Sequence, residues 1–175
     1  MNTDPRVNNN DRFLAFSNLQ QKLKGCFMKT KHTVRVRWLI RKDMPMINEI
    51  NMEANYQLLE EDIVALMRSR NVTGMVIDLD DVVAGYMIYG LNRSSIELLH
   101  MVVDPVFTGL GLGRVMLEKL KSKLIENRTS VYTTVSEYNV QAQVFLRACG
   151  FGVVKTLKDW DENGDGYIFE HVRMT

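Results

Sequence analysis

The sequence predicts an α/β protein of mixed α+β character, in which helices flank a central mixed β-sheet. The first observation is size: 175 residues, 46% of them hydrophobic, are enough for one domain with a buried core. The second is order, because runs with strand and helix periodicity follow each other as β-α-α-β-β-β-α-β-α-β-β. The third is a strand that passes through a Gly-rich loop directly into a helix, within residues 95–124.

The first half of the domain supplies two helices and four strands. Residues 34–40 alternate between apolar and polar side chains, as a half-buried strand does. Asp43 is suited to cap a helix predicted over 44–54, and a second helix is expected over 60–69. Three further strands are expected at 73–78, 82–91 and 95–103.

The second half of the domain adds two helices and three strands. Arg114 opens a helix whose apolar residues recur at helical spacing, and a shorter helix is expected over 140–148. The three strands are expected at 131–136, 153–158 and 168–173.

Residues 1–33 are predicted to form an extension outside the domain, which we place at 34–175. Residues 1–12 are polar and Asn-rich, and we expect them to be disordered. Residues 13–27 carry apolar side chains near helical spacing and predict a short amphipathic helix. We expect this helix to pack on its own domain or on a neighbouring copy, which leaves a homodimer open. A segment that docks a partner is the alternative.

The Gly-rich loop is the most informative segment, because residues 108–113 read Thr-Gly-Leu-Gly-Leu-Gly between a strand and a helix. Glycines let backbone N–H groups converge on phosphate oxygens, and the helix dipole favours negative charge there. The spacing differs from the dinucleotide fingerprint G-x-G-x-x-G, and no Gly-Lys-Ser/Thr follows as in a P-loop. We therefore expect a ligand with a pyrophosphate on residues 108–114.

The loop resembles the acetyl-CoA loop of the GNAT superfamily of N-acetyltransferases, which reads Q/R-x-x-G-x-G/A, although Thr108 stands in place of Gln or Arg. A second block, residues 131–151, has the family's strand, Asn, short helix and Gly-Phe in register. The resemblance covers roughly residues 34–174 and is greatest to ribosomal-protein alanine N-acetyltransferases. The matching positions of the second block are Val135, Asn139, Ala142, Gly150 and Phe151.

The resemblance implies a GNAT-like acetyltransferase fold, acetyl-CoA as co-substrate, and a primary amine as acceptor: a protein N-terminus, a lysine or a small molecule. In the family, backbone groups before the loop pair with the pantetheine arm, and loop N–H groups bind the pyrophosphate. Asn139 matches an Asn that touches the cofactor and is also suited to cap the following helix. The implied cofactor-binding residues are Met101, Val102, Val103, Thr108, Gly109, Gly111, Leu112, Gly113, Arg114 and Asn139.

The catalytic positions depart from those relatives. By register, Thr134 stands where the alanine N-acetyltransferases carry a Glu base, and Leu146 stands where they carry a Tyr acid. Thr does not titrate near neutral pH, and Leu does not titrate at all. The family's mechanism therefore cannot be transferred to these two residues.

Other residues offer a base and an acid. Glu97 and His100 lie on the strand before the loop, and the ordinary pKa of histidine suits a general base. On a regular strand the two side chains face opposite sides, but a β-bulge, which the family has here, would bring them together. Tyr138 and Tyr132 are candidate acids for the leaving thiolate.

Two alternatives to an N-acetyltransferase remain open. Because the family's Glu and Tyr are missing, the domain can instead be a non-catalytic GNAT-like module that binds acyl-CoA. In addition, residues 159–170 match the spacing of an EF-hand calcium loop. The flanks of this segment are strand-like, and Asp, Asn and Gly are typical of hairpin turns, so we expect a hairpin and no metal site.

Composition excludes several classes of partner. The net charge of +1 gives no argument for nucleic acid or for an anionic membrane. No apolar run approaches the ~18–20 residues that span a bilayer, and the N-terminus lacks the apolar core of a signal peptide. Cys26 and Cys149 do not make a disulfide framework, which fits a reducing compartment. We therefore expect a cytoplasmic enzyme without a nucleic-acid or membrane partner.

Overall fold

The computed structural model describes residues 32–162 and 164–173. The amphipathic helix predicted over 13–27 lies outside the described residues, as does nearly all of the proposed extension. Among the described residues, no helix is long and apolar enough to cross a membrane.

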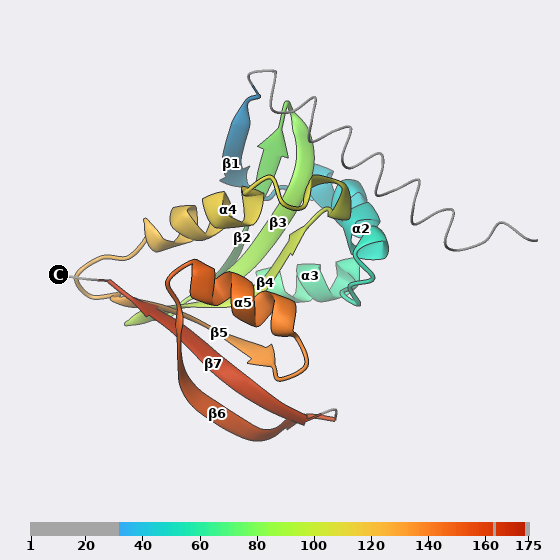
Figure 1. Cartoon of the computed structure of the whole chain (residues 1–175). Coiled ribbons are helices and arrows are strands. Elements are labelled where there is room, and N and C mark those ends of the chain that lie inside the picture. The colour runs from blue at the N-terminus through green and yellow to red at the C-terminus, as the bar shows by residue number, and fades with distance from the viewer. Residues whose placement is uncertain (1–31, 163, 174–175) are drawn as a thin grey trace, which may run out of the picture.

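A single mixed sheet forms the centre of the molecule, with the strand order β1-β2-β3-β4-β5-β7-β6 (Figure 1). Strands β4 and β5 run parallel, whereas the other neighbouring pairs are antiparallel. The predicted fold class is confirmed. The strands are β1 (Val34–Trp38), β2 (Val72–Leu79), β3 (Val82–Leu91), β4 (Ser95–Val103), β5 (Ser130–Ser136), β6 (Gly152–Asp161) and β7 (Gly164–Val172).

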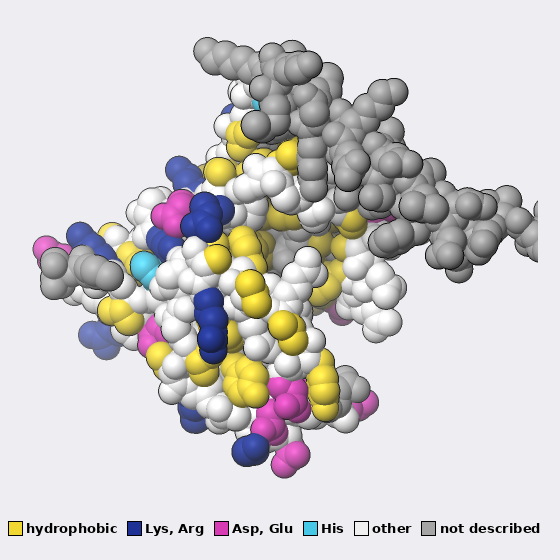
Figure 2. Space-filling view, viewed as in Figure 1, with side chains coloured by type: hydrophobic (Ala, Val, Ile, Leu, Met, Phe, Trp, Pro, Cys, Tyr) yellow, Lys and Arg dark blue, Asp and Glu magenta, His cyan; other side chains and the backbone are white. Residues whose placement is uncertain are grey.

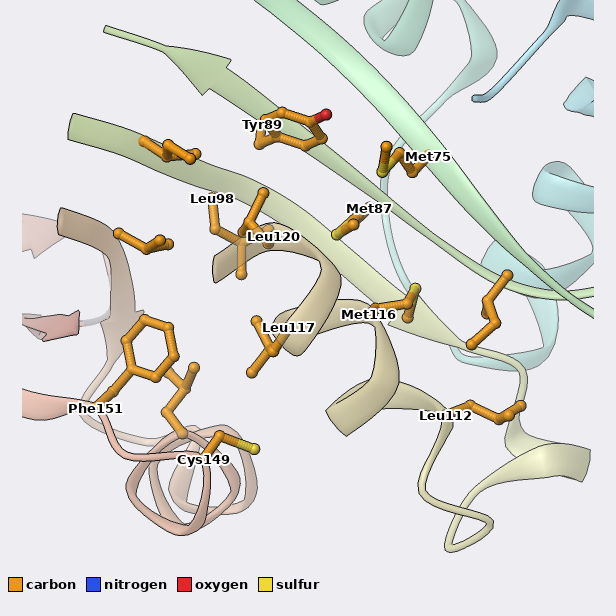
Figure 3. Packing of buried hydrophobic residues seen from close by; sticks show 14 of the residues in the cluster. Met75, Met87, Tyr89, Leu98, Leu112, Met116, Leu117, Leu120, Cys149 and Phe151 are labelled. Carbon is orange, nitrogen blue, oxygen red and sulfur yellow. The ribbon is translucent and has the colours of Figure 1, made fainter. Parts of the chain in front are cut away.

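Helices cover both faces of this sheet. Successive residues of a strand point to opposite faces, and the central strands carry apolar side chains on both. On one face α2 and α3 pack over a cluster that includes Val76, Tyr86 and Ile88. On the other face α4 and α5 pack over Met87 and Leu98, and Figure 3 shows this core at close range. The helices are α2 (Met44–Glu53), α3 (Glu60–Met67), α4 (Leu112–Lys121) and α5 (Val140–Ala148), with short 3-10 turns at Arg41–Asp43 and Pro105–Phe107.

The helices and strands predicted within residues 34–173 are all present, and the differences are local. Helix α4 begins at Leu112, two residues before the predicted Arg114, because Gly111 in a left-handed conformation already starts the turn. Strands β6 and β7 extend towards each other through the Asp-rich segment, so this segment is the end of a β-hairpin, as expected.

Asp43 does not play the role predicted from the sequence. It occupies the position before α2, but its side chain makes no capping hydrogen bond to that helix. Its carboxylate instead accepts hydrogen bonds from the guanidinium of Arg37 at 2.8 Å and from the backbone N–H of Ile40 at 2.9 Å. A charged bidentate partner is worth more to a buried carboxylate than a helix cap, and Arg37 also bonds Asp78, which ties β1 and β2 to the start of α2.

The parallel strands β4 and β5 separate soon after they meet, and this separation positions the site. Their pairing covers only Ser95–Glu97 against Ser130–Tyr132. Just beyond it, the hydroxyl of Thr133 donates to the carbonyl oxygen of Leu98 at 2.8 Å, at the point where the two strands separate. The rest of β4 keeps its pairing to β3 but loses its partner on the β5 side. A wedge-shaped gap therefore opens in the middle of the sheet.

Candidate active site

A cleft of about 480 Å³ occupies the gap between β4 and β5. In Figure 2 the surface is hollowed in the middle of the molecule, beside α5. Residues from both strands, from α5, from the loop between α2 and α3, and from β6 contribute to its walls. The lining residues are Tyr56, Glu97, Leu98, Leu99, His100, Met101, Thr133, Thr134, Val135, Ser136, Asn139, Ala142, Phe145, Leu146 and Trp160.

A β-bulge in β4 brings the two candidate bases to the same side of the sheet. Gly90 of β3 pairs with Glu97 and Ile88 pairs with His100, so Leu99 is an extra residue on β4. Residues paired across an antiparallel ladder share a face, and Gly90 and Ile88 are two positions apart. Glu97 and His100 therefore both face the side covered by α2 and α3, and both line the cleft.

His100 is held by a residue that the sequence did not single out. The hydroxyl of Tyr56 lies 2.8 Å from Nδ1 of His100 in a hydrogen bond. Burial lowers the pKa of His100 below its ordinary value, and the negative charge of Asp62 partly opposes that shift. The lowered pKa favours the neutral imidazole near pH 7, and Nδ1 is engaged by Tyr56. Tyr56 lies 44 positions before His100 in the sequence, and no local spacing connects the two.

The Gly-rich loop lies close to the cleft, because its Gly113 packs against the cleft-lining Phe145. Asp104 and Thr108 brace its start, because the Asp104 carboxylate accepts from the N–H of Val106 and the Thr108 hydroxyl donates to a backbone carbonyl. Gly109 and Gly111 have φ angles of +78° and +80°, which favour glycine. Gly111 is the N-cap of α4 and provides no capping side chain.

The first turn of α4 fits a phosphate group. The first helical hydrogen bond that starts at the N-cap runs from the N–H of Val115 to the carbonyl of Gly111. The N–H groups of Leu112, Gly113 and Arg114 precede it and have no carbonyl to bond within the helix. The helix dipole favours negative charge at this end, and an added Cβ on Gly111 would meet nothing within 4 Å. The residues present therefore suit the pyrophosphate that the sequence predicts.

Gly113 has a different reason for being glycine. A Cβ built on it would lie 3.1 Å from Cζ of Phe145, so its absence allows α4 and α5 to approach closely. The side chain of Leu112 is buried in the core, and only its backbone is available to a ligand. Met101 lines the cleft, whereas Val102 is buried under α2 and α3.

The two residues that the sequence aligns with the base and the acid of the alanine N-acetyltransferases both line the cleft. Thr134 lines it, and Leu146 lines it from α5 while being 3% exposed within the core. Asn139 also lines it, and its side chain accepts a hydrogen bond from the N–H of Ala142 at 3.0 Å as the N-cap of α5. Its predicted capping role is therefore confirmed.

The two tyrosines considered as acids lie elsewhere. Tyr138 is 70% exposed next to the β6–β7 hairpin and is not among the lining residues of the cleft. Tyr132 lies in the paired part of β5, where Asn92 donates to its hydroxyl at 3.4 Å. Burial, with a further contribution from Glu97, raises the pKa of Tyr132.

The Asp-rich hairpin uses its acidic side chains internally. Asp165 accepts from the ammonium of Lys158 and the N–H of Asp159, and Asp161 accepts from the N–H of Gly164. Figure 2 shows acidic side chains gathered over the end of this hairpin. Among the described residues, no group of three or more side chains is arranged to hold a metal ion.

Comparisons with known proteins agree with this geometry. The model of the acetyltransferase (GNAT) family matches residues 34–151. No curated protein sequence matches the chain significantly.

Solved structures of the same fold are numerous. The ribosomal-protein-S18-alanine N-acetyltransferase of Escherichia coli is 19% identical, with a TM-score of 0.70 over 82% of this chain and 96% of that one. Ard1 from Thermoplasma volcanium is 20% identical, with a TM-score of 0.69 over 81% and 99%. A spermidine N-acetyltransferase variant from Vibrio cholerae is 19% identical, with a TM-score of 0.66 over 80% and 94%. At these identities the likeness shows the fold.

Proposed function

The chain belongs to the acetyltransferase (GNAT) family, and we propose that it is an N-acetyltransferase that moves an acetyl group from acetyl-CoA to a primary amine by direct transfer. The observation that carries the proposal is the gap between β4 and β5. Glu97 and His100 line it, and so does Phe145, against which Gly113 at the start of α4 packs. A non-catalytic module that binds acyl-CoA is the alternative, and only turnover separates the two.

Acetyl-CoA would be held mainly by backbone groups. The N–H groups at the start of α4 suit its pyrophosphate, with Arg114 adding positive charge nearby. Backbone groups of Met101–Val103 that point away from β3 have lost their strand partner and suit the amide groups of the pantetheine arm. Acetyl-CoA supplies a thioester whose carbonyl carbon accepts the amine.

The acceptor amine must lose its positive charge before it can react, and the chain places two groups to take that proton. Glu97 and His100 face the α2–α3 side of the sheet, opposite α4 and α5. Held beside the thioester, the amine would react as if its concentration were very high. The departing thiolate is a weak base, so water can protonate it in place of the acid that Leu146 cannot supply.

The acceptor would reach the cleft past the loop between α2 and α3. A second cavity of about 470 Å³ lies there, and Tyr56 lines both cavities. Its walls include Glu60 and Glu61, whereas the first cavity includes Glu97. Among the described residues that line the two cavities there is no Lys or Arg. This surface suits an ammonium group on its way to the base better than an anion.

Two measurements test the proposal. Calorimetry should detect binding of acetyl-CoA, and release of free thiol should follow when acceptors are added. The panel should contain spermidine, a peptide with a free N-terminal alanine, and a peptide whose amine is a lysine side chain. Binding without turnover of any acceptor would favour the non-catalytic alternative, and absence of binding would contradict both. We also propose that the protein acts in the cytoplasm, where acetyl-CoA and reduced cysteines coexist.

A further inference from the structure

We propose that Tyr56 is a positioning residue that keeps the proton of His100 on Nδ1, so that Nε2 is free to take the proton of the acceptor amine. The inference rests on the proposed acetyl transfer, with His100 as its base. Tyr56 comes from the loop between α2 and α3, and it lies far in the sequence from β4, the strand that carries His100.

The contact between the two rings is direct. The Tyr56 hydroxyl lies 2.8 Å from Nδ1, and the rings meet edge to face with centroids 6.0 Å apart and planes at 74°. A hydrogen bond at one ring nitrogen decides which nitrogen carries the proton and fixes the rotation of the ring. Tyr56 also lines both cavities, and His100 lines the first. An acceptor that enters through the second cavity would therefore pass Tyr56 and reach the His100 ring that Tyr56 orients.

Tyr56 is held in place by a buried amide rather than left to move with its loop. Asn51 is 4% exposed, and its backbone carbonyl accepts from the N–H of Tyr56 at 2.8 Å. The Asn51 side chain donates to the carbonyl of Leu58 and accepts from the hydroxyl of Tyr86, both at 2.7 Å. The loop is thus fastened at two points to Asn51 of α2, and Tyr86 of β3 holds the Asn51 side chain in turn, which gives the Tyr56 hydroxyl a defined position.

The direction of the Tyr56–His100 hydrogen bond decides whether His100 can work as a base. If the hydroxyl donates to Nδ1, the proton lies on Nε2, and Nε2 has no lone pair to accept another. If Nδ1–H donates to the hydroxyl oxygen, Nε2 is the acceptor, and the hydroxyl proton of Tyr56 is directed away from His100. Only the second arrangement supports catalysis.

The proton balance of the step follows from that arrangement. Nε2 first takes the ammonium proton of the amine and passes it to solvent. The neutral amine nitrogen then bonds to the acetyl carbon, and its second N–H bond breaks as an N–H bond forms at Nε2 and the C–S bond breaks. The imidazolium then returns its proton to solvent or to the departing sulfur. While His100 is charged, its Nδ1–H bond to Tyr56 becomes charge-assisted and therefore stronger.

The charged groups around His100 determine in which direction its pKa should change when the Tyr56 hydroxyl is removed. Asp62 from α3 favours the charged ring, and Glu97 from β4 faces the same side of the sheet. Burial raises the pKa values of Tyr56 and of Tyr86 on β3, so both hydroxyls stay neutral while His100 titrates. Replacing the Tyr56 hydroxyl should therefore lower the pKa of His100 if the hydroxyl accepts, and raise it if the hydroxyl donates.

Nuclear magnetic resonance of the full chain with 15N-labelled histidine reads both quantities without an acceptor. The His100 signals are assigned by their loss in His100→Gln. We expect the Nδ1–H form in the wild type, and in Tyr56→Phe a larger share of Nε2–H with a lower pKa. An Nε2–H form in the wild type, or a higher pKa in Tyr56→Phe, overturns the inference.

Kinetics supply the second readout, with whichever of spermidine or the alanine peptide is turned over. Tyr56→Phe keeps the ring and should lower kcat about 10–100-fold while the affinity for acetyl-CoA stays unchanged. Tyr89→Phe is the matched control, because its buried hydroxyl has no hydrogen-bond partner among the described residues. If kcat is unchanged in Tyr56→Phe but falls strongly in His100→Gln, the positioning role of Tyr56 is contradicted and the proposed function is left intact. A wild type without turnover would instead remove the proposed function and the catalytic part of the inference with it, and the tautomer would then show only whether Tyr56 keeps the proton on Nδ1.

Discussion

The two sides of the cleft differ in the kind of atom they offer to a ligand. On the side of α4, the loop from Gly109 to Arg114 offers backbone N–H groups. On the side of α2 and α3, the groups are the side chains of Glu97, His100 and Tyr56. A backbone site depends on local chain conformation, which glycine spacing reveals. A side-chain site depends on strand register and on loops from elsewhere in the sequence.

This difference has a consequence for how each side tolerates change. A backbone site withstands most substitutions except those that add bulk or negative charge in the path of the phosphates. A side-chain site fails when one atom is lost, even where the fold is intact. Variants on the two sides should therefore separate the binding of acetyl-CoA from the rate of transfer.

The largest effect is expected for the base. His100→Gln should lower kcat/KM by about 10²–10⁴-fold while leaving acetyl-CoA bound. Below its pKa the imidazole is charged and cannot take a proton, so the wild-type kcat/KM should rise with pH through that pKa. Burial lowers the pKa of His100, so the rise should lie on the acidic side of an ordinary histidine. A pH profile of kcat/KM for the wild type and for His100→Gln measures both effects.

Glu97→Gln is the companion variant on the same side of β4. If Glu97 were the base, this variant would carry the large loss and His100→Gln would keep its rate. If both variants keep the full rate, transfer does not use this side of the cleft, and the comparison between the two sides fails.

The sequence predicted the frame of the site better than its chemistry. Periodicity and glycine spacing indicated every strand and helix of the described domain, because these signals are local. The bulge at Leu99 has no local signal, since the sequence of β4 reads as an ordinary strand. It was considered only because the resemblance suggested it, and the register of β3 with β4 shows where it lies.

Two residues show why the side-chain contacts of the site and of the fold around it could not be predicted from the sequence. Tyr56 lies in a polar loop that could serve any purpose until the fold brings it against His100. Asp43 was suited to cap a helix, but Arg37 of β1 offers a stronger partner that only the tertiary structure reveals. Local preferences gave way in both places to contacts between distant segments.

The second effect concerns binding. Gly111→Glu places a carboxylate at the start of α4, where the helix dipole and the free N–H groups favour an anion. This carboxylate would compete with and repel the pyrophosphate, so the affinity for acetyl-CoA should fall about 100-fold or more. Gly111→Gln is the control, because Gln matches Glu in size and in backbone strain at φ +80° but adds no charge. Calorimetry should give a smaller loss of affinity for Gly111→Gln than for Gly111→Glu. Equal affinity for Gly111→Glu and the wild type would show that the pyrophosphate lies elsewhere.

The third effect concerns the position where related enzymes carry an acid. Leu146 is 3% exposed and packs in the core beneath the cleft, so Leu146→Tyr should lower the free energy of unfolding by ~1–3 kcal/mol without raising kcat. Leu146→Met keeps the volume and should change stability less. A thermal melt beside the activity assay measures both. A faster Leu146→Tyr variant with an unchanged Tm would show that the site has room for an acid.

The smallest effect separates the two roles proposed for Asn139, which lines the cleft at the start of α5. Its side chain caps α5 through the N–H of Ala142, so Asn139→Ala should lower the free energy of unfolding by ~1 kcal/mol. Asn139→Ser keeps a capping oxygen and should restore most of that loss. If Asn139 also contacts acetyl-CoA, Ser should restore the Tm but not the affinity, because the shorter hydroxyl does not reproduce the amide donor. If affinity and Tm recover together, capping is its whole role, and cofactor binding on this side rests on backbone groups alone.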